Sequence, residues 1–156
     1  MDKYRPRKTV LCLIDRYVSE GRYSISHPVL EDIMAKLLPS RGYRVIWLMQ
    51  SVEPNSGGKK INWHGSEIHL MPSGDGTRFW GRIWNLLWRI FFLKRFILST
   101  VEENHVDVVQ VRNDWVAARA ARDLRKLSVP LIFQWSFPHY KVHLARIEDG
   151  MSRFPA

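Results

Sequence analysis

The sequence predicts a single α/β domain built on a doubly wound parallel sheet, and three observations lead to this fold class. Short, β-branched apolar runs alternate with amphipathic helical patterns along the chain, as they do in proteins with parallel sheets. The chain has 156 residues, of which 46% are hydrophobic and 25% charged, which suits one globular domain with a substantial core. Residues 107–138 also contain a complete strand–helix–strand unit, the repeating element of such sheets.

The N-terminal half supplies three strands and one helix. Pro28 follows Ser26 and His27, and proline is accepted in the first helical turn because its missing N–H is not needed there. Pro39 and Gly42 end the apolar stripe that follows. The resulting elements are a strand at residues 9–15, a loop at 15–26, a helix at 29–38, strands at 43–50 and 67–72, and a hairpin or mobile loop at 51–66.

The strand–helix–strand unit follows in the C-terminal half. The predicted strand carries apolar, β-branched Val108, Val109 and Val111, as in a strand covered on both faces. Asn113 and Asp114 come next, and either side chain can accept a hydrogen bond from the free N–H groups of a helix start. The helix then carries an apolar stripe opposite several basic residues, and a last buried strand is predicted at residues 131–133.

The loops that follow the first, fourth and fifth predicted strands indicate where a ligand binds. In an open parallel sheet these loops meet at the carboxyl ends of the strands, where ligand sites form. Each polar residue there also has an ordinary structural interpretation, as a helix cap or a solvated side chain, whereas the edge taken as a whole favours function. The residues expected in a substrate or acceptor cleft are Asp15, Arg16, Ser26, His27, Arg112, Asn113, Asp114, Ser136 and His139.

Residues 78–98 are predicted to form an unusual amphipathic helix. At ~100° per residue, a narrow polar stripe of Arg78, Arg82, Asn85 and Arg89 lies away from an aromatic side of Trp80, Trp84, Trp88 and Phe91. Basic residues interrupt the apolar run, so the helix cannot span a bilayer. Two interpretations stay open: a crossover helix whose tryptophans are core, or a helix at a membrane interface. The membrane interface would then involve Arg78, Trp80, Arg82, Trp84, Trp88 and Arg89.

The formal net charge of +9 indicates an anionic partner or surface. Nucleic acid is the less favoured partner, because no helix-turn-helix, zinc-finger or aromatic RNA-binding pattern accompanies the charge. An anionic membrane surface is preferred. Cys12 is the single cysteine, and the apolar run at residues 10–14 is too short for a signal peptide. We therefore expect a cytoplasmic protein, peripheral on the inner face of the membrane.

Several chemistries have no motif in this sequence. There is no GxGxxG turn after the first strand, no phosphate-binding GxxxxGK[ST] loop and no DxD motif. His139 and His143 have helical i, i+4 spacing, but no third metal ligand stands near them in the sequence. We expect neither a metal nor a cofactor.

The segments DVVQVRNDWVAARAA and SVPLIFQWSFP resemble the second half of the N-terminal domain of GT-B glycosyltransferases, specifically the retaining family 4 type. The N-terminal third is similar as well, through VLCLID, the helix around VLEDIMAKLL, and SRGYRVIWL, in which Tyr43 replaces the family's histidine. The resemblance covers roughly residues 8–139. It implies a Rossmann-like acceptor-binding domain at 9–150, half of a GT-B architecture, preceded by a basic lead-in at 1–8 and followed by a truncated tail at 151–156.

The resemblance implies metal-independent sugar transfer from a nucleotide sugar, with retained configuration, in polysaccharide or glycolipid synthesis. The nucleotide sugar would be bound mainly by a second, donor-binding domain or subunit, and the acceptor would be a lipid-linked molecule or a glycan. Two departures matter. Ser136 stands where the family often has a histidine, with His139 three residues further on. The glutamate pair of the second domain, E-x7-E, has no counterpart here, so we do not expect activity from this chain alone. The alternative is a non-enzymatic basic module that docks on an anionic membrane or a protein.

Overall fold

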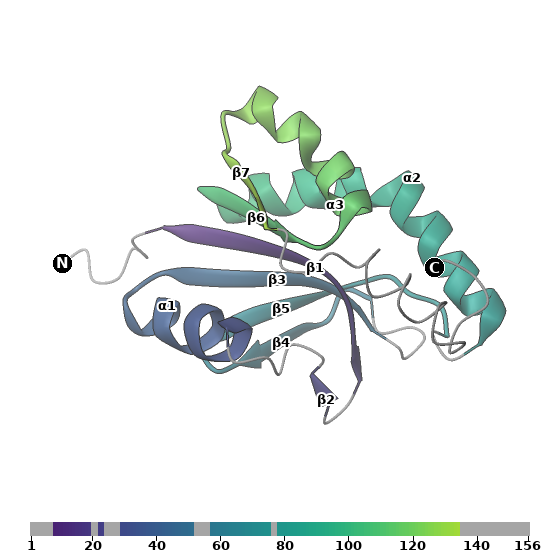
Figure 1. The fold of residues 1–156 in the computed structure, drawn as a ribbon, viewed down its shortest axis with the longest axis horizontal. Coiled ribbons are helices and arrows are strands. Elements are labelled where there is room, and N and C mark those ends of the chain that lie inside the picture. Colours follow the sequence, from purple (N-terminus) through teal and green to yellow (C-terminus); the bar gives the residue numbers. More distant parts are fainter. Residues whose placement is uncertain (1–7, 20–21, 24–28, 52–56, 76–77, 135–156) are drawn as a thin grey trace, which may run out of the picture.

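The protein is an α/β domain with a mostly parallel sheet, which confirms the α/β part of the prediction. The computed structural model describes residues 8–19, 22–23, 29–51, 57–75 and 78–134. The seven described strands form one sheet in the order β4-β5-β3-β1-β6-β7, with the short β2 paired to the end of β1 (Figure 1).

The long strand β1 (Thr9–Ser19) lies in the middle of the sheet. Its parallel neighbours are β3 (Arg44–Ser51) and β6 (Val108–Arg112), beyond which lie β5 (Ser66–Met71) and β7 (Leu131–Gln134), also parallel. Of the two antiparallel strands, β4 (Lys60–Trp63) is the longer, and it lies at the edge of the sheet beside β5. All carboxyl ends of the parallel strands therefore face the same way.

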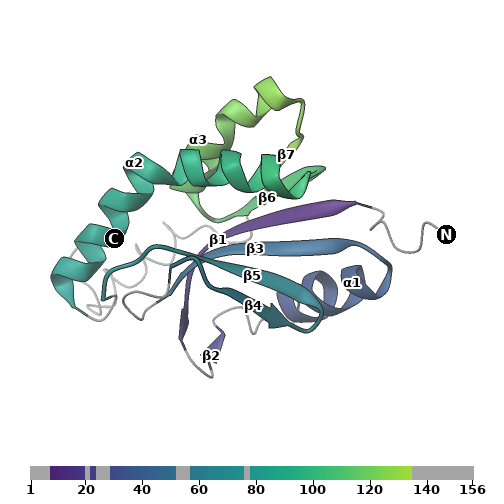
Figure 2. The same ribbon diagram turned by 180° about the vertical axis from the view of Figure 1, so that it is seen from behind.

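Helices cover both faces of the sheet. The π-helical segment η1 (Val29–Leu37) and the turn α1 (Leu38–Ser40) cover one face, into which β1 directs Val10, Cys12 and Ile14. The other face carries α2 (Phe79–Asn104), α3 (Trp115–Ala120) and the 3-10 helix η2 (Ala121–Leu127). Leu11 and Leu13 of β1 point to this second face, because successive strand residues alternate sides. Figure 2, which is turned by 180° from Figure 1, shows this second face with α2 towards the viewer.

Two boundaries differ clearly from the sequence-based expectations, and one alternative left open by the sequence is resolved. The loop predicted from residue 15 is wrong in its first part, because β1 continues to Ser19 after a register shift against β3 and then pairs with β2 (Arg22–Tyr23). Of the two alternatives for residues 51–66, the hairpin is the one observed over 60–66, where Trp63 pairs with Ser66. The helix expected to end at residue 98 continues to Asn104, because Thr100 and Val101 still pack against the sheet.

Helix α2 has 26 residues, about 39 Å at 1.5 Å per residue, so it is longer than the sheet face needs. Its C-terminal half buries Leu93, Ile97 and Val101 against the sheet. Its N-terminal half extends past the carboxyl ends of the strands in both views (Figures 1 and 2). This projecting half lies next to the edge at which the sequence predicts a ligand site.

Candidate functional site

The candidate site begins where β1 and β6 lie side by side at the carboxyl edge. Arg112, the last residue of β6, pairs in register with Ile14 of β1. Asn113 then adopts a left-handed backbone with φ of 53°, a conformation that asparagine tolerates better than most residues. Its N–H donates to the Gln134 carbonyl at 3.1 Å, so the turn that leaves β6 is held against β7.

Asp114 joins two helices at this edge. Its Oδ1 accepts from the Ala117 N–H at 2.9 Å, which caps α3 as the sequence predicts. Its Oδ2 accepts from the Arg89 guanidinium of α2, and the two residues are only 4% and 7% exposed. A buried pair of this kind is costly to break, because the remaining charge stays away from water. The pair fixes α2 against α3.

Asn85, one helical turn before Arg89, is a second buried polar residue on the same side of α2. Its Oδ1 accepts from the Gly74 N–H at 2.7 Å, which ties the helix to the segment after β5. Its Nδ2 has no hydrogen-bond partner in the part of the chain that the structure describes. Gly81 allows the close approach here, because a Cβ at that position would lie 2.6 Å from the Asp75 carbonyl carbon.

These contacts set the rotation of α2 about its own axis. Half of the polar stripe turns inward, and the aromatic side turns outward: Trp80 is 76% exposed and Phe91 70%. The interpretation of the tryptophans as core is therefore wrong for Trp80 and Trp84, both of which are exposed. Trp88 is half-buried and packs edge-on against Phe96. Arg89, expected at a membrane surface, lies inside the protein instead.

The other predicted site residues divide into three groups. Arg112, Asn113 and Asp114 come together at the carboxyl edge as expected. Asp15 and Arg16 belong to β1, but their side chains are not among the described ones. The expectations for Ser26, His27, Ser136 and His139 also lie outside the described residues.

Arg112 borders a small cavity of about 10 Å³ beneath the edge, together with Cys12, Ile14 and Met34. A space of this size holds one water molecule at most, so any larger ligand would bind on the rim of the edge and not inside it. The guanidinium of Arg112 and the amide of Asn113 are groups suited to oxygen-rich ligands, such as sugar hydroxyls or a phosphate. Burial raises the pKa of the Cys12 thiol, which keeps this group protonated and unreactive.

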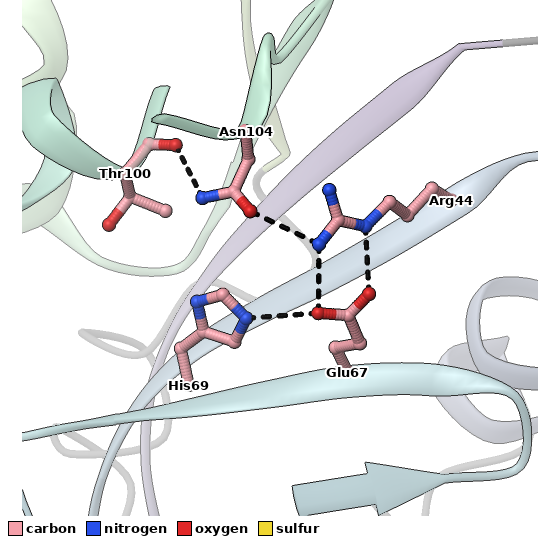
Figure 3. Close-up of polar contacts among 5 residues, drawn as sticks. All are labelled: Arg44, Glu67, His69, Thr100 and Asn104. Atoms are coloured by element: carbon pink, nitrogen blue, oxygen red, sulfur yellow. Dashed lines mark hydrogen bonds and ion pairs between the residues drawn. The ribbon is translucent and has the colours of Figure 1, made fainter. Parts of the chain in front are cut away.

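A polar network lies at the opposite edge of the sheet, where β3 and β5 begin (Figure 3). Arg44 donates from Nε and Nη2 to the Glu67 carboxylate at 2.7 and 3.0 Å, and from Nη2 to Asn104 Oδ1 at 3.1 Å. The carboxylate also accepts from His69 Nε2 at 3.2 Å, and Asn104 Nδ2 donates to the Thr100 carbonyl at 2.9 Å. The network attaches the end of α2 to the sheet. Sequence analysis did not single out these residues, which lie up to 60 positions apart.

The charges of this network indicate a structural role. The hydrogen bonds from Arg44, helped by that from His69, lower the pKa of Glu67 to about 2, so the carboxylate is ionised at any physiological pH. Burial lowers the pKa of His69, which leaves its ring neutral and its Nε2–H available to Glu67. A carboxylate with so low a pKa as Glu67 does not titrate where a general acid or base is useful.

We expect Glu67→Gln to lower the free energy of unfolding by about 1–2 kcal/mol near neutral pH, a figure reduced for screening because the Glu67 side chain is 34% exposed. Since the folded-state pKa lies below the ordinary value of 4.5, the contribution of Glu67 is complete above pH 4.5 and is lost as the pH falls towards 2. Urea unfolding from pH 7 to 2 measures this difference. It should shrink over that acidic range, whereas the exposed Glu103→Gln control should match the parent throughout. A difference independent of pH would contradict the assignment.

The described ranges of the chain contain no group of three or more His, Cys, Asp or Glu side chains that could hold a metal ion. Within the same ranges, no helix has both the length and the apolar character needed to cross a bilayer.

No protein-family model matches this chain, and neither does any curated protein. The chemistry of the carboxyl edge and of α2 therefore has to be argued from the residues themselves.

Proposed function

We propose that this chain is the acceptor-binding N-terminal domain of a retaining, metal-independent GT-B glycosyltransferase that acts in polysaccharide or glycolipid synthesis. A nucleotide sugar serves as donor and is bound mainly by a second domain or subunit. The chain works at the cytoplasmic face of a membrane, where its acceptor is a lipid-linked molecule or a glycan.

The strand order around β1 is the observation that supports this proposal most directly. From β1 the chain builds β3 and β5 on one side, and then crosses through α2 to build β6 and β7 on the other. In a doubly wound sheet this change of direction leaves a crevice for ligand at the carboxyl ends of the two central strands. Arg112 and Asn113 lie at that point, on the unit whose sequence resembles the glycosyltransferases.

An assay of sugar transfer tests the proposal. The chain is isolated from its own cells together with the partners that it binds. The preparation is supplied with a panel of radiolabelled nucleotide sugars and the membrane fraction, in the presence of EDTA. We expect EDTA-resistant incorporation of label, reduced about 10-fold or more by Arg112→Ala, because the acceptor loses a charged contact at the edge.

The matched control is Arg125→Ala, which removes an exposed arginine from η2, and it should retain the activity of the parent. Thermal unfolding establishes that both variants fold. Label that stays entirely in the nucleotide sugars would contradict the transferase proposal. The second candidate, a non-enzymatic docking module, is favoured by the exposed aromatic side of α2 and predicts that outcome.

A further inference from the structure

We infer that the projecting half of α2 docks on an anionic lipid bilayer through an outward row of Trp80, Trp84, Leu87 and Phe91. This inference goes beyond sugar transfer, because it concerns the outward side of α2 and not the strand ends at Arg112, and it holds for either candidate function. All four side chains are exposed in the structure.

The geometry of α2 makes this row continuous. The four residues follow at i, i+4, i+7 and i+11, which places them within roughly 60° of one another on a helix of ~100° per residue. Asn85 and Arg89 occupy the opposite side and are held there by Gly74 and Asp114. The aromatic row is therefore fixed away from the sheet and does not result from a loosely attached helix.

The apolar surface extends to both sides of the row. Further exposed apolar side chains on the same half of α2 are Phe79, Leu86, Ile90 and Phe92. Single exposed apolar residues are ordinary, but a contiguous group of this size on one helix marks a surface that contacts something apolar. Tryptophan is enriched at headgroup depth in membrane proteins, and Trp, Phe and Leu form the apolar side of helices that lie in the membrane interface.

The charges around the row select an anionic partner. No acidic residue occurs in α2 before Glu102, whereas Arg95 is exposed beside the row, one helical turn after Phe91. Arg95 also borders an open groove of about 430 Å³ that continues from Phe91, and no ion pair to an acidic residue engages it in the described structure. The groove is further lined by Lys94, Leu98, Ser99 and Glu102, with Lys94 paired to Asp123. Arginine beside exposed aromatic rings suits a lipid phosphate.

The position of α2 in the fold allows a flat surface to reach the row. Because the N-terminal half extends past the carboxyl ends of the strands, the sheet does not stand in front of it (Figures 1 and 2). Interfacial helices lie in the plane of the membrane with their apolar side about 5–10 Å deep. We infer that the partner of the row is a bilayer and not a folded protein, because the row is convex and bordered by cations.

Flotation of the full chain with lipid vesicles tests the inference. We expect the parent to bind phosphatidylcholine vesicles with about one-third phosphatidylglycerol at least ~10-fold more tightly than pure phosphatidylcholine vesicles. Trp80→Ala/Phe91→Ala should weaken binding to the anionic vesicles about 10- to 100-fold. The matched control is Trp115→Ala/Leu127→Ala, which removes two exposed apolar side chains from α3 and η2 and should bind as the parent does.

Circular dichroism of each variant and light scattering after size-exclusion chromatography accompany the flotation. Parent protein that stays unbound to anionic vesicles overturns the inference, as does equal binding by both double variants. A parent dimer that Trp80→Ala/Phe91→Ala converts to monomer, with no vesicle binding by either protein, would instead assign the row to a contact between two copies. Sugar transfer is not part of this readout, so vesicle binding can succeed or fail independently of the transferase proposal.

Discussion

Replacing Arg89 with methionine is expected to lower the free energy of unfolding by about 3–5 kcal/mol, because the change leaves the Asp114 carboxylate buried without its guanidinium partner. Methionine keeps most of the length and apolar stem of arginine, so the loss reports the charge and not a cavity. Urea unfolding at neutral pH measures the effect. The exposed Arg82→Met, two turns earlier on α2, should stay within about 0.5 kcal/mol of the parent.

A double-mutant cycle separates the ion pair from the cap that Asp114 provides. Asparagine at position 114 can still accept from the Ala117 N–H, so Asp114→Asn removes the charge and keeps the cap. Arg89→Met/Asp114→Asn should therefore cost less than the sum of the two single changes, with a coupling of about 0.5–3 kcal/mol. Strict additivity would show that the two side chains do not depend on each other for stability.

We expect Trp47→Ala to destabilise the protein by about 3–5 kcal/mol, the usual range for removal of a buried aromatic side chain. Trp47 lies on β3, is 1% exposed, and meets Trp63 edge-on with ring centroids 6.3 Å apart. Its Nε1–H donates to Ser66 Oγ at 3.0 Å. For a chain of this length the cost corresponds to a fall in Tm of about 10 °C, which differential scanning calorimetry measures.

Two further variants identify the source of this effect. Trp47→Phe keeps an aromatic ring and loses the indole N–H, so it should cost about 1–2 kcal/mol. Trp115→Ala removes a tryptophan that is 64% exposed, and its Tm should fall by a few degrees at most. If Trp47→Ala and Trp115→Ala had the same Tm, the packing of the β3 face would have to be different from that described.

The α/β class and the order of most elements could be predicted because they depend on local patterns. The β-branched run before Asn113, the cap at Asp114 and the stop at Gly42 all act within a few residues of themselves, whereas Pro39 lies inside the turn α1. The end of β1 could not be predicted, because its extension to Ser19 depends on pairing with β3 and β2. Strand pairing is a property of distant segments.

The orientation of α2 is the most instructive difference between sequence and structure. Periodicity correctly grouped Asn85 with Arg89, and Trp80 with Trp84, on separate sides of the helix. It could not indicate which side faces inward, because that depends on Asp114 and Gly74 in other parts of the chain. Of the predicted cleft, the part formed by residues 112–114 comes together through strand register. The Arg44–Glu67 network depends on pairing between β3 and β5, which no local pattern reveals.

The buried contacts of Asn85 and Arg89 also mean that the surface chemistry of this domain depends on very few positions. Leucine at both positions would remove the hydrogen bonds that set the rotation of α2 and leave little to distinguish its buried side from its aromatic side, while the strand order rests on other residues. The exposed apolar surface of the domain could in this way be gained or lost without a change in its topology. In this chain, residues 85, 89 and 114 are therefore the positions at which a change would alter the exposed surface of α2 most.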